Sequence, residues 1–303
     1  MKIAIIGYGR MAQEYRKVVE YLGHTVCCFM KREVVRARED KIKIVYYLTD
    51  LLDCNPDAII VAVSQKETKN ILIDLLKYLL KQVIPILVEK PAAFTNNDFD
   101  EIMKWENSEY VKVGYNRRFY SGVNEIKTKI NKCFPKSIYI NLPEPIDMYN
   151  IYYLWEFPLH YSASHVIDLL FYFFNMDIRI NYMDRIENCY VGILMIREIP
   201  VLFKAVFNSP EHTKMTFNFE GEVWSLCPIE ELCIYDKLIK NENDGKYHMN
   251  IKMKIVEDRT FKPGLLEQVR QFLYFNEKDN LATLEDARRV SEFCNEIVTG
   301  VRC

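Results

Sequence analysis

The feature that most constrains the fold of this chain is a glycine turn near its start, Gly7-x-Gly9-x-x-Ala12. It follows the short apolar run 3–6 directly and opens a stretch with helical periodicity. In a strand–turn–helix unit of this kind, the first glycine permits a tight turn, the second lets a pyrophosphate approach the backbone, and a small third residue lets helix and strand pack closely. The turn therefore predicts a Rossmann-type dinucleotide-binding domain, whose phosphate loop comprises Gly7, Gly9, Arg10, Met11 and Ala12. Arg10 either contacts the phosphate or is solvated.

Short β-branched runs and helical patterns alternate through the first half of the chain, which is typical of a parallel sheet with helices on both faces. Gly23 is placed to end the first helix, and Thr49 is the expected N-cap of a short helix. The expected strands are 3–6, 25–30, 42–46, 58–63, 84–88 and 110–114, and the expected longer helices are 11–22, 67–80 and 97–105.

The pattern changes after Arg118, where tyrosine-rich, alternating segments predict a mostly antiparallel sheet. Its expected strands include 137–142, 189–196, 201–207 and 214–219. The apolar stretch 158–174 predicts one long buried helix, 265–275 and 284–298 predict closing helices, and 240–246 predicts an exposed hairpin or loop. The predicted fold class is α/β: a doubly wound Rossmann domain over 1–119, followed by an α+β domain with an open sheet over 120–303. The C-terminal helix is free to pack back on the first domain.

Bulk properties exclude several classes of partner. The formal net charge of -2 provides no basic field for nucleic acid, and the longest apolar runs are far shorter than a membrane span. The nine cysteines are scattered without a paired framework, and the first residues lack the pattern of a signal peptide. We therefore expect a cytoplasmic protein that binds small molecules and neither nucleic acid nor membrane.

The end of the second expected strand bears on the choice of cofactor. Sites that prefer NAD carry an acidic residue there, whereas this chain reads Phe29-Met30-Lys31-Arg32 with no carboxylate before Glu33. A guanidinium beside an ammonium suits a 2′-phosphate, so Lys31 and Arg32 favour NADP over NAD. The alternative is a solvated basic turn.

Glu89-Lys90-Pro91 follows the expected strand 84–88. Ligands bind at the carboxyl edge of a parallel sheet, and an ammonium delivered there can hydrogen-bond a substrate hydroxyl or carbonyl. Taken alone, a Glu-Lys pair such as Glu89-Lys90 is more often a surface ion pair.

These motifs carry a resemblance to a known family. The glycine loop, Glu89-Lys90-Pro91 and the segment 113–119 (Val-Gly-Tyr-Asn-Arg-Arg-Phe) resemble, in order and spacing, the Gfo/Idh/MocA oxidoreductases. The stretch 162–170 is similar to the family helix in which a histidine, here His165, is followed three residues later by an aspartate, here Asp168. The segment 283–289 resembles the final helix of the family.

The resemblance implies a Rossmann domain followed by a domain with an open sheet, one face of which closes the active site while the other often forms a subunit interface. It also implies hydride transfer between a nicotinamide and a hydroxyl or carbonyl carbon of a sugar, sugar nucleotide or cyclitol, with assembly into a homodimer or homotetramer. By motif, Lys90 would orient the reacting oxygen and His165 would exchange its proton at the domain cleft. Ser64 and Glu89 would face the cofactor, and Asp168 the substrate.

Three features depart from the family pattern or remain open. Many members place an aspartate four residues before the histidine, where this chain has Tyr161; this residue serves either as a proton donor or as a packing aromatic, and His160 competes for the same role. Arg117 and Arg118 either bind a substrate phosphate or carboxylate or hold the two domains together. A metal set of His160, His165 and Asp168 is not expected, because one long helix cannot bring all three to one point.

Two other functions are possible besides an oxidoreductase that acts on sugars. The first is a reductase of a small non-sugar carbonyl or a biliverdin-like substrate, which the change at Tyr161 keeps open. The second is a non-catalytic protein that binds NADP as a sensor or as a partner subunit. Retention of Glu89-Lys90-Pro91 argues against the second alternative.

Overall fold

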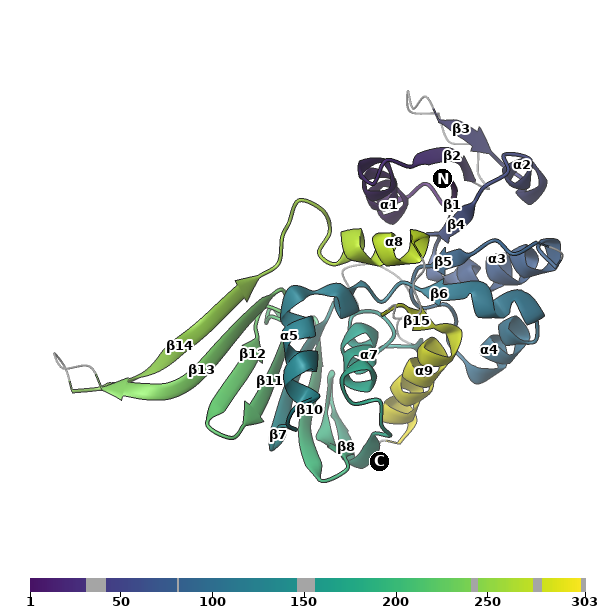
Figure 1. Ribbon diagram of the computed structural model, residues 1–303. Helices are drawn as coiled ribbons and strands as arrows, with labels where there is room; N and C mark the ends of the chain where they lie inside the picture. Colours follow the sequence, from purple (N-terminus) through teal and green to yellow (C-terminus); the bar gives the residue numbers. More distant parts are fainter. Residues whose placement is uncertain (31–41, 81, 146–155, 241–244, 275–279, 301–303) are drawn as a thin grey trace. The chain divides into compact units, whose positions relative to one another are not determined.

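The computed structural model describes residues 1–30, 42–80, 82–145, 156–240, 245–274 and 280–300 (Figure 1). The chain divides into two compact units. The first comprises Met1–Phe119 and Arg259–Glu292, and the second comprises Tyr120–Asp258 and Phe293–Cys303. The first unit thus includes a segment from late in the chain, which contains α8 (Leu265–Leu273). From the sequence, only the C-terminal helix was expected to pack on the first domain.

The first unit is built on a seven-stranded sheet with the order β15-β6-β5-β4-β1-β2-β3. All neighbouring pairs are parallel except β15 with β6. The strands are β1 (Lys2–Ile6), β2 (Thr25–Met30), β3 (Lys43–Val45), β4 (Ala58–Val61), β5 (Ile86–Val88), β6 (Val111–Val113) and β15 (Ala282–Thr283). The order 3-2-1-4-5-6 is that of a doubly wound Rossmann sheet, which confirms the predicted class of the N-terminal fold.

The helices of this unit largely follow the sequence pattern. The helix α1 (Arg10–Tyr21) ends just before Gly23, whose φ of +79° is the left-handed conformation expected there. The prediction of Thr49 as an N-cap is wrong: α2 (Leu48–Leu52) has Tyr47 at its N-cap with no side-chain hydrogen bond, and Thr49 lies inside the helix. The remaining helices are α3 (Gln65–Tyr78), α4 (Asn96–Met103), the 3-10 turns η1 (Glu106–Tyr110) and η2 (Asn116–Phe119), and α8.

The central strands of the first unit are apolar on both faces, as parallel strands covered by helices must be. All four residues of β4 are fully buried. On one face, α1 and the late helix α8 pack into a single apolar cluster that includes Ile5, Val18, Phe29 and Val269. The first unit therefore depends on a helix encoded about 250 residues after its first strand.

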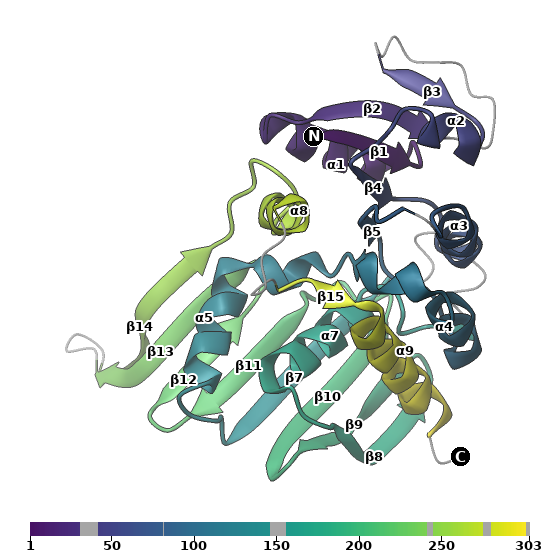
Figure 2. The ribbon, with the colours of Figure 1, turned by 45° about the vertical axis from the view of Figure 1, so that its right-hand side comes forward.

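The second unit contains an eight-stranded sheet with the order β14-β13-β12-β11-β7-β10-β9-β8 (Figure 2). Only β7 with β10 is parallel, so the sheet is mostly antiparallel as predicted. Its strands are β7 (Ser137–Glu144), β8 (Arg179–Ile186), β9 (Cys189–Ile196), β10 (Ile199–Phe207), β11 (Lys214–Phe219), β12 (Glu222–Leu226), β13 (Glu231–Lys240) and β14 (Tyr247–Val256).

Two helices, α5 (Ser121–Ile130) and α7 (Ala163–Phe174), lie over one face of this sheet (Figure 2). Phe173 of α7 meets Phe217 of β11 edge to face at 5.5 Å, so the buried side chains of the alternating strands face these helices. Within the described ranges, no helix of this unit lies on the opposite face (Figure 2). The helix α9 (Leu284–Thr299) has its first residues in the first unit and its last in the second.

The expected single helix over 158–174 is wrong. Residues 158–162 form turns, and α7 starts only at Ala163. The buried carboxylate of Glu144, at the end of β7, accepts hydrogen bonds from the backbone N–H groups of Ser162 and Ala163 and so satisfies the helix start. Apolar composition was misleading here because the turn residues Pro158 and Leu159 are buried as completely as the helix.

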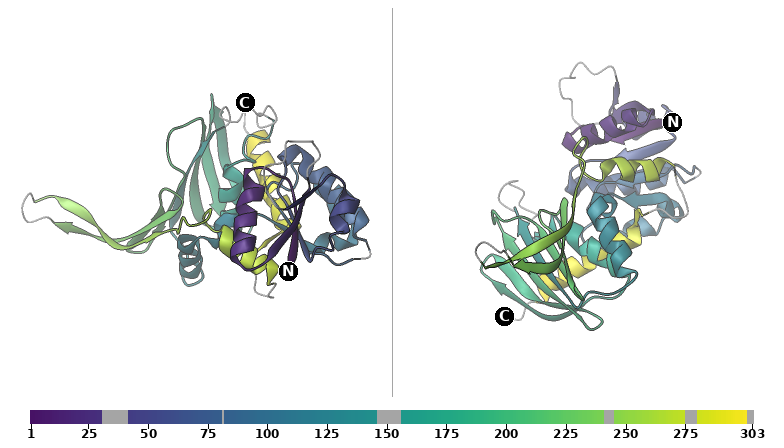
Figure 3. Two further views of the ribbon diagram at one scale, coloured as in Figure 1. Left: turned by 90° about the horizontal axis from the view of Figure 1, so that it is seen from above. Right: turned by 60° about the vertical axis from the view of Figure 1, so that its left-hand side comes forward.

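The expected hairpin near 240–246 is confirmed. The strand β13 ends at Lys240 and pairs antiparallel with β14, which starts at Tyr247. Figures 1 and 3 show this two-stranded ribbon extending from its sheet as an arm. No helix in the described ranges is both long and apolar enough to cross a membrane.

Candidate cofactor and substrate site

The glycine loop has the close backbone approach that its sequence implies. Gly7 adopts φ +114°, and a Cβ atom placed on it would lie 2.1 Å from the carbonyl oxygen of Ala62, immediately after β4. Its N–H donates to the carbonyl of Met30 at 2.9 Å, and Ala12 is completely buried beneath the loop. Gly7 therefore lets β1 turn against β4, and Ala12 lets α1 pack on the sheet.

The second glycine, Gly9, has open space around it, unlike Gly7. Gly9 is the N-cap of α1, and a Cβ atom placed on it meets nothing within 4 Å. No side chain caps this helix and no acidic residue lies in its first turn. Arg10 is exposed beside Gly9. The uncapped N–H groups and the helix dipole favour an anion at this position, so Gly7, Gly9 and the start of α1 fit the pyrophosphate of a dinucleotide.

Three predicted site segments follow the carboxyl ends of adjacent strands. Because β5, β4 and β1 are neighbours in the sheet, Glu89-Lys90, Ser64 and the glycine loop lie along one edge. Ser64 is exposed and is the N-cap of α3, which begins two residues earlier than expected; its hydroxyl bonds to Glu67 at 3.1 Å. Glu89 and Lys90 are half-buried. The fold thus brings the glycine loop, Ser64 and Glu89, which were predicted to face the cofactor, to one edge of the first unit's sheet.

The motif residue Glu89 is held by side chains that the sequence analysis missed. The hydroxyl of Tyr15 donates to Glu89 Oε1 at 2.6 Å and also lies 3.3 Å from Gln268 Oε1. Burial, reinforced by the negative charge of Glu89, raises the pKa of Tyr15 well above its usual range. Tyr15 and Gln268 are both fully buried. The available signal was the polar hydroxyl of Tyr15 within the otherwise apolar stripe of α1 formed by Ala12, Val18 and Val19.

The predicted NADP determinants Lys31 and Arg32 lie outside the described residues. The strand that precedes them, β2, contains no carboxylate and ends at Met30. A cavity of about 320 Å³ adjoins Met30, and aromatic side chains form much of its wall. Its lining consists of Met30, Tyr46, Tyr47, Leu48, Thr49, Asp74 and Tyr78. In a Rossmann sheet, the adenosine half of the cofactor binds beside the end of this strand.

Arg117 and Arg118 occupy η2 but differ in their surroundings. Arg118 is 5% exposed, and its Nη1 lies 3.4 Å from Asp286 Oδ2, so it connects η2 to the start of α9 within the first unit. In Arg117, the buried Nη1 has no hydrogen-bond partner among the described residues. Of the two candidates for anion binding, Arg117 retains donor capacity, while Arg118 has a structural partner.

The remaining predicted catalytic residues belong to the second unit. His165 and Asp168 lie on α7, and both are buried, at 8% and 0% exposure. Tyr161 is half-buried and lies in the turns before α7, so the expectation that it stands one helical turn before His165 is wrong. His160 also precedes the helix, and its ring packs edge to face on Phe157 at 5.4 Å. His160, His165 and Asp168 therefore do not share one helix, and the described residues contain no group of three His, Cys, Asp or Glu side chains that could hold a metal ion.

A second residue that the sequence analysis missed is Glu144. Its carboxylate is 0% exposed, and its Oε2 accepts from the N–H of Ser162 at 3.1 Å while Oε1 accepts from the N–H of Ala163. The negative charge faces the positive end of the α7 dipole, which is the favourable orientation. Because His165 lies in the first turn of α7, Glu144 fixes the part of the helix that carries it. No motif flagged this residue, since its role depends on pairing between β7 and a distant turn.

A doubly wound parallel sheet with an open phosphate loop, followed by a unit with a mostly antiparallel sheet, defines a dinucleotide-binding protein of the two-unit Rossmann class. Residues 1–117 match the oxidoreductase family with an NAD-binding Rossmann fold, known as Gfo/Idh/MocA. The match covers the N-terminal domain and confirms the resemblance inferred from the motifs. No curated protein matches the sequence significantly.

Solved structures share the fold over nearly the whole chain. UDP-N-acetylglucosamine 3-dehydrogenase from Acidithiobacillus ferrooxidans is 12% identical with a TM-score of 0.76, covering 99% of this chain and 97% of that one. A dehydrogenase from Clostridium difficile is 18% identical with a TM-score of 0.75, covering 99% of each chain. A super-repressor mutant of Gal80p from Saccharomyces cerevisiae is 13% identical with a TM-score of 0.73, covering 99% of this chain and 95% of that one. At these identities, the similarity establishes the fold.

Proposed function

We propose that this protein is an NAD(P)-dependent oxidoreductase that transfers a hydride between the nicotinamide and a hydroxyl or carbonyl carbon of a sugar, sugar nucleotide or cyclitol. The observation that carries the proposal is the position of Glu89-Lys90-Pro91 at the carboxyl end of β5, on the same sheet edge as the glycine loop. A lysine at that edge is placed to meet a substrate beside a bound dinucleotide. The likeness to a sugar-nucleotide dehydrogenase supports this substrate class.

Two side chains have distinct roles in the proposed reaction. The bound cofactor supplies the carbon that accepts or returns the hydride. The ammonium of Lys90 donates a hydrogen bond to the reacting oxygen and orients it, and the imidazole of His165 takes the hydroxyl proton during oxidation and returns it during reduction. Tyr161 stands where many family members have an aspartate, and we assign it a supporting role in that proton exchange. Asp168 and Arg117 complete the proposed substrate contacts; Arg118, paired with Asp286, contributes through the loop that it fixes.

We further propose that NADP is preferred over NAD. The described part of β2 offers no carboxylate to the adenosine ribose, and Lys31 and Arg32 follow it in the sequence. Two adjacent cations suit a 2′-phosphate. The KM for NADP should rise at least tenfold in the Lys31→Ala/Arg32→Ala variant while the KM for NAD changes little. An equal change for both cofactors would contradict this preference.

A second candidate function is a non-catalytic protein that binds NADP as a sensor or partner subunit. The structural likeness to Gal80p and the replacement of the usual aspartate by Tyr161 favour it. A reductase of a small non-sugar carbonyl or biliverdin-like compound is a third reading, in which the Lys90–His165 pair matters less. Both readings keep the cofactor site and change only the chemistry beside it.

The decisive experiment measures cofactor reduction or oxidation with nucleotide sugars, free sugars, cyclitols, keto acids and biliverdin. We expect turnover with a member of the first three classes, and a decrease in kcat/KM of at least 100-fold for Lys90→Ala and for His165→Ala. Lys77→Ala is the matched control, because Lys77 is an exposed lysine at the end of α3. Turnover that is insensitive to Lys90→Ala would contradict the mechanism. Cofactor binding without turnover on any substrate would favour the sensor.

We also propose that the protein assembles as a homodimer or homotetramer, since soluble oligomers are mostly symmetric assemblies of one chain. The cytoplasmic location remains a prediction. It is consistent with the eight described cysteines, which are all free thiols.

A further inference from the structure

The arm formed by β13 and β14 exposes a row of apolar side chains, and the register between its two strands shifts on either side of Tyr235. In β14, apolar side chains at 247, 249, 251 and 253 alternate with His248, Asn250, Lys252 and Lys254. Met249 pairs directly with Leu238 of β13, so these two side chains point to the same side of the ribbon. The apolar arm face is defined here as Leu238, Tyr247, Met249, Ile251 and Met253.

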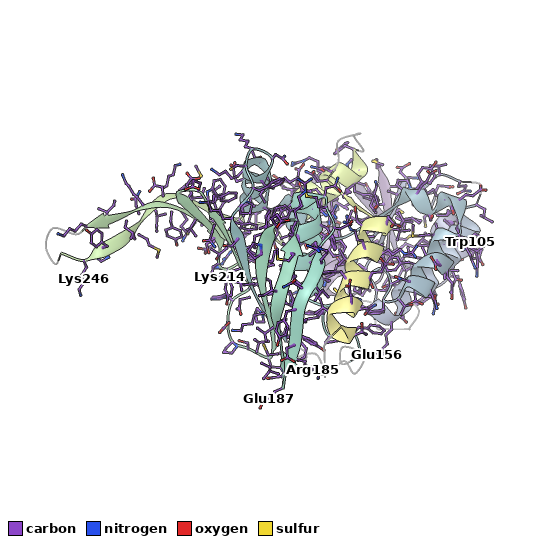
Figure 4. The ribbon with its side chains drawn as sticks, turned by 90° about the horizontal axis from the view of Figure 1, so that it is seen from below. Trp105, Glu156, Arg185, Glu187, Lys214 and Lys246 are labelled. Atoms are coloured by element: carbon purple, nitrogen blue, oxygen red, sulfur yellow. The ribbon has the colours of Figure 1, made fainter. Side chains whose placement is uncertain are left out.

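The apolar arm face continues a buried surface of the sheet. Leu232 and Ile234, on the same side of β13, are only 1% and 3% exposed, and α5 packs against β13 and β14. Met253, which pairs with Ile234, is 45% exposed, and the other four residues of the apolar arm face, further along the arm, are 54% to 66% exposed. Figure 4 labels Lys246 at the far end of the arm, well beyond the body of the sheet. The apolar side chains of these two strands are thus buried near α5 and exposed toward the tip of the arm.

An uncovered face of this kind is costly in water. A two-stranded hairpin is only marginally stable by itself, and β14 is also the edge strand of its sheet, with a backbone available for pairing. Contiguous exposed apolar surface on such an element marks an interaction site. We propose that the apolar arm face is an interface with a second copy of this chain.

The available area suits a symmetric dimer. With roughly 120 Å² exposed on each of the five side chains, one face offers about 600 Å², and two copies together bury about 1,200 Å², the lower bound for a stable interface. In a two-fold dimer the same patch of each copy forms the interface, so the apolar arm face of one copy can pack on that of the other. Leu232, on this side of β13, lies against Gly122 of α5, so the side concerned is the one on which α5 packs.

Charge argues against a lipid or nucleic-acid partner. Two lysines of β14 are paired within the chain, Lys252 with Glu222 at 2.6 Å and Lys254 with Glu231 at 2.8 Å, which leaves the exposed Lys237 and Lys240 of β13 as the other cations of the two strands. Asn250 likewise donates to Asp236 at 2.7 Å. With a formal net charge of -2, the chain offers little attraction for phosphate groups, whereas a second copy needs only the apolar contact.

This inference names a surface for the proposed homo-oligomer and is independent of the proposed hydride transfer. The test compares wild-type protein with the Met249→Glu/Ile251→Glu variant by sedimentation velocity over a range of concentrations. The control is Ile239→Glu, on the same strand pair but on the opposite side, where Ile239 pairs with His248 and is 46% exposed. We expect a wild-type dimer, a dissociation constant raised at least 100-fold in the double variant, and a control that matches the wild type.

Hydrogen–deuterium exchange provides a second readout. Amides of residues 247–253 should be protected at high wild-type concentration and lose that protection on dilution or in the double variant. Thermal unfolding of the three proteins at low concentration verifies that each is folded. The proposal is overturned if the wild type is monomeric throughout, if the double variant associates as tightly as the wild type, or if a monomeric wild type binds phosphatidylserine-containing vesicles through the arm. Cofactor turnover assayed on the same samples separates a failure of this proposal from a failure of the proposed function.

Discussion

The hydroxyl of Tyr15 donates a 2.6 Å hydrogen bond to Glu89 Oε1 and thereby joins the helix after the glycine loop to the residue before Lys90. Tyr15 is fully buried, and its raised pKa keeps the hydroxyl protonated, and so a donor, at neutral pH. Two of the motifs that carry the resemblance to the family are therefore connected by a side chain that belongs to neither.

Removing this hydroxyl should weaken cofactor binding. Tyr15→Phe retains the buried ring but leaves the carboxylate of Glu89 without one of its donors, and a hydrogen bond to a charged group is worth about 1.5–3 kcal/mol. We expect the Kd for the dinucleotide to rise about tenfold and the thermal midpoint to fall by a few degrees. Titration calorimetry and calorimetric unfolding measure both quantities. Tyr21→Phe, at a 65% exposed tyrosine on the same helix, should change neither; equal effects of the two substitutions would refute the role of Tyr15.

The two glycines of the loop should respond differently to the same substitution. Gly7→Ala places a methyl group against the carbonyl of Ala62 at a φ of +114°, so we expect a loss of stability of about 2–4 kcal/mol. Gly9→Ala has an ordinary φ of -76° and open space around the new methyl group, so the thermal midpoint should change by less than about 2 °C. Dinucleotide affinity should nevertheless fall in Gly9→Ala, because the methyl group occupies the approach of the pyrophosphate. Unimpaired affinity in Gly9→Ala would count against this loop as the phosphate site.

Glu144 should matter for stability and for the reaction attributed to His165. Glu144→Gln removes the negative charge at the start of α7 and turns an amide NH₂ toward a backbone N–H. We expect a cost of about 2 kcal/mol in the free energy of unfolding and a decrease in kcat that exceeds any change in cofactor affinity. Glu156→Gln, at an exposed glutamate, is the control. A variant that loses stability but keeps kcat would restrict Glu144 to a structural role.

Glu222 links α5, β12 and β14, and its charge should make the second unit sensitive to acid. Hydrogen bonds from Lys129 at 2.8 Å and Lys252 at 2.6 Å lower the pKa of Glu222 to about 2. An unfolded glutamate titrates near ~4.3, so the stabilisation is present above that pH and is lost as the pH falls toward the folded-state value. The thermal midpoint of Glu222→Gln should lie a few degrees below that of the wild type at pH 7, and the difference should shrink below about pH 4. A difference that does not change with pH would exclude this ion pair as its cause.

Local patterns predicted the first unit well because each element there is defined by adjacent residues. Period-two and period-3.6 patterns located the strands and α1, and Gly23 correctly marked the end of that helix. The start of α7 was misplaced because Pro158 and Leu159 are as buried as the helix, and hydropathy alone does not separate a buried turn from a buried helix. Tyr161 was assigned a helical position for the same reason.

The sequence by itself determined the phosphate loop, the Glu89-Lys90-Pro91 segment and the resemblance to the family, because these depend on residue types at fixed local spacings. The tertiary structure alone revealed the support of those motifs: Tyr15 bonded to Glu89, with Gln268 beside Tyr15, and Glu144 at the start of α7. It also added α8 to the first unit and left the apolar arm face uncovered. Such contacts join residues up to 253 positions apart, and only chain folding determines which buried polar groups become partners.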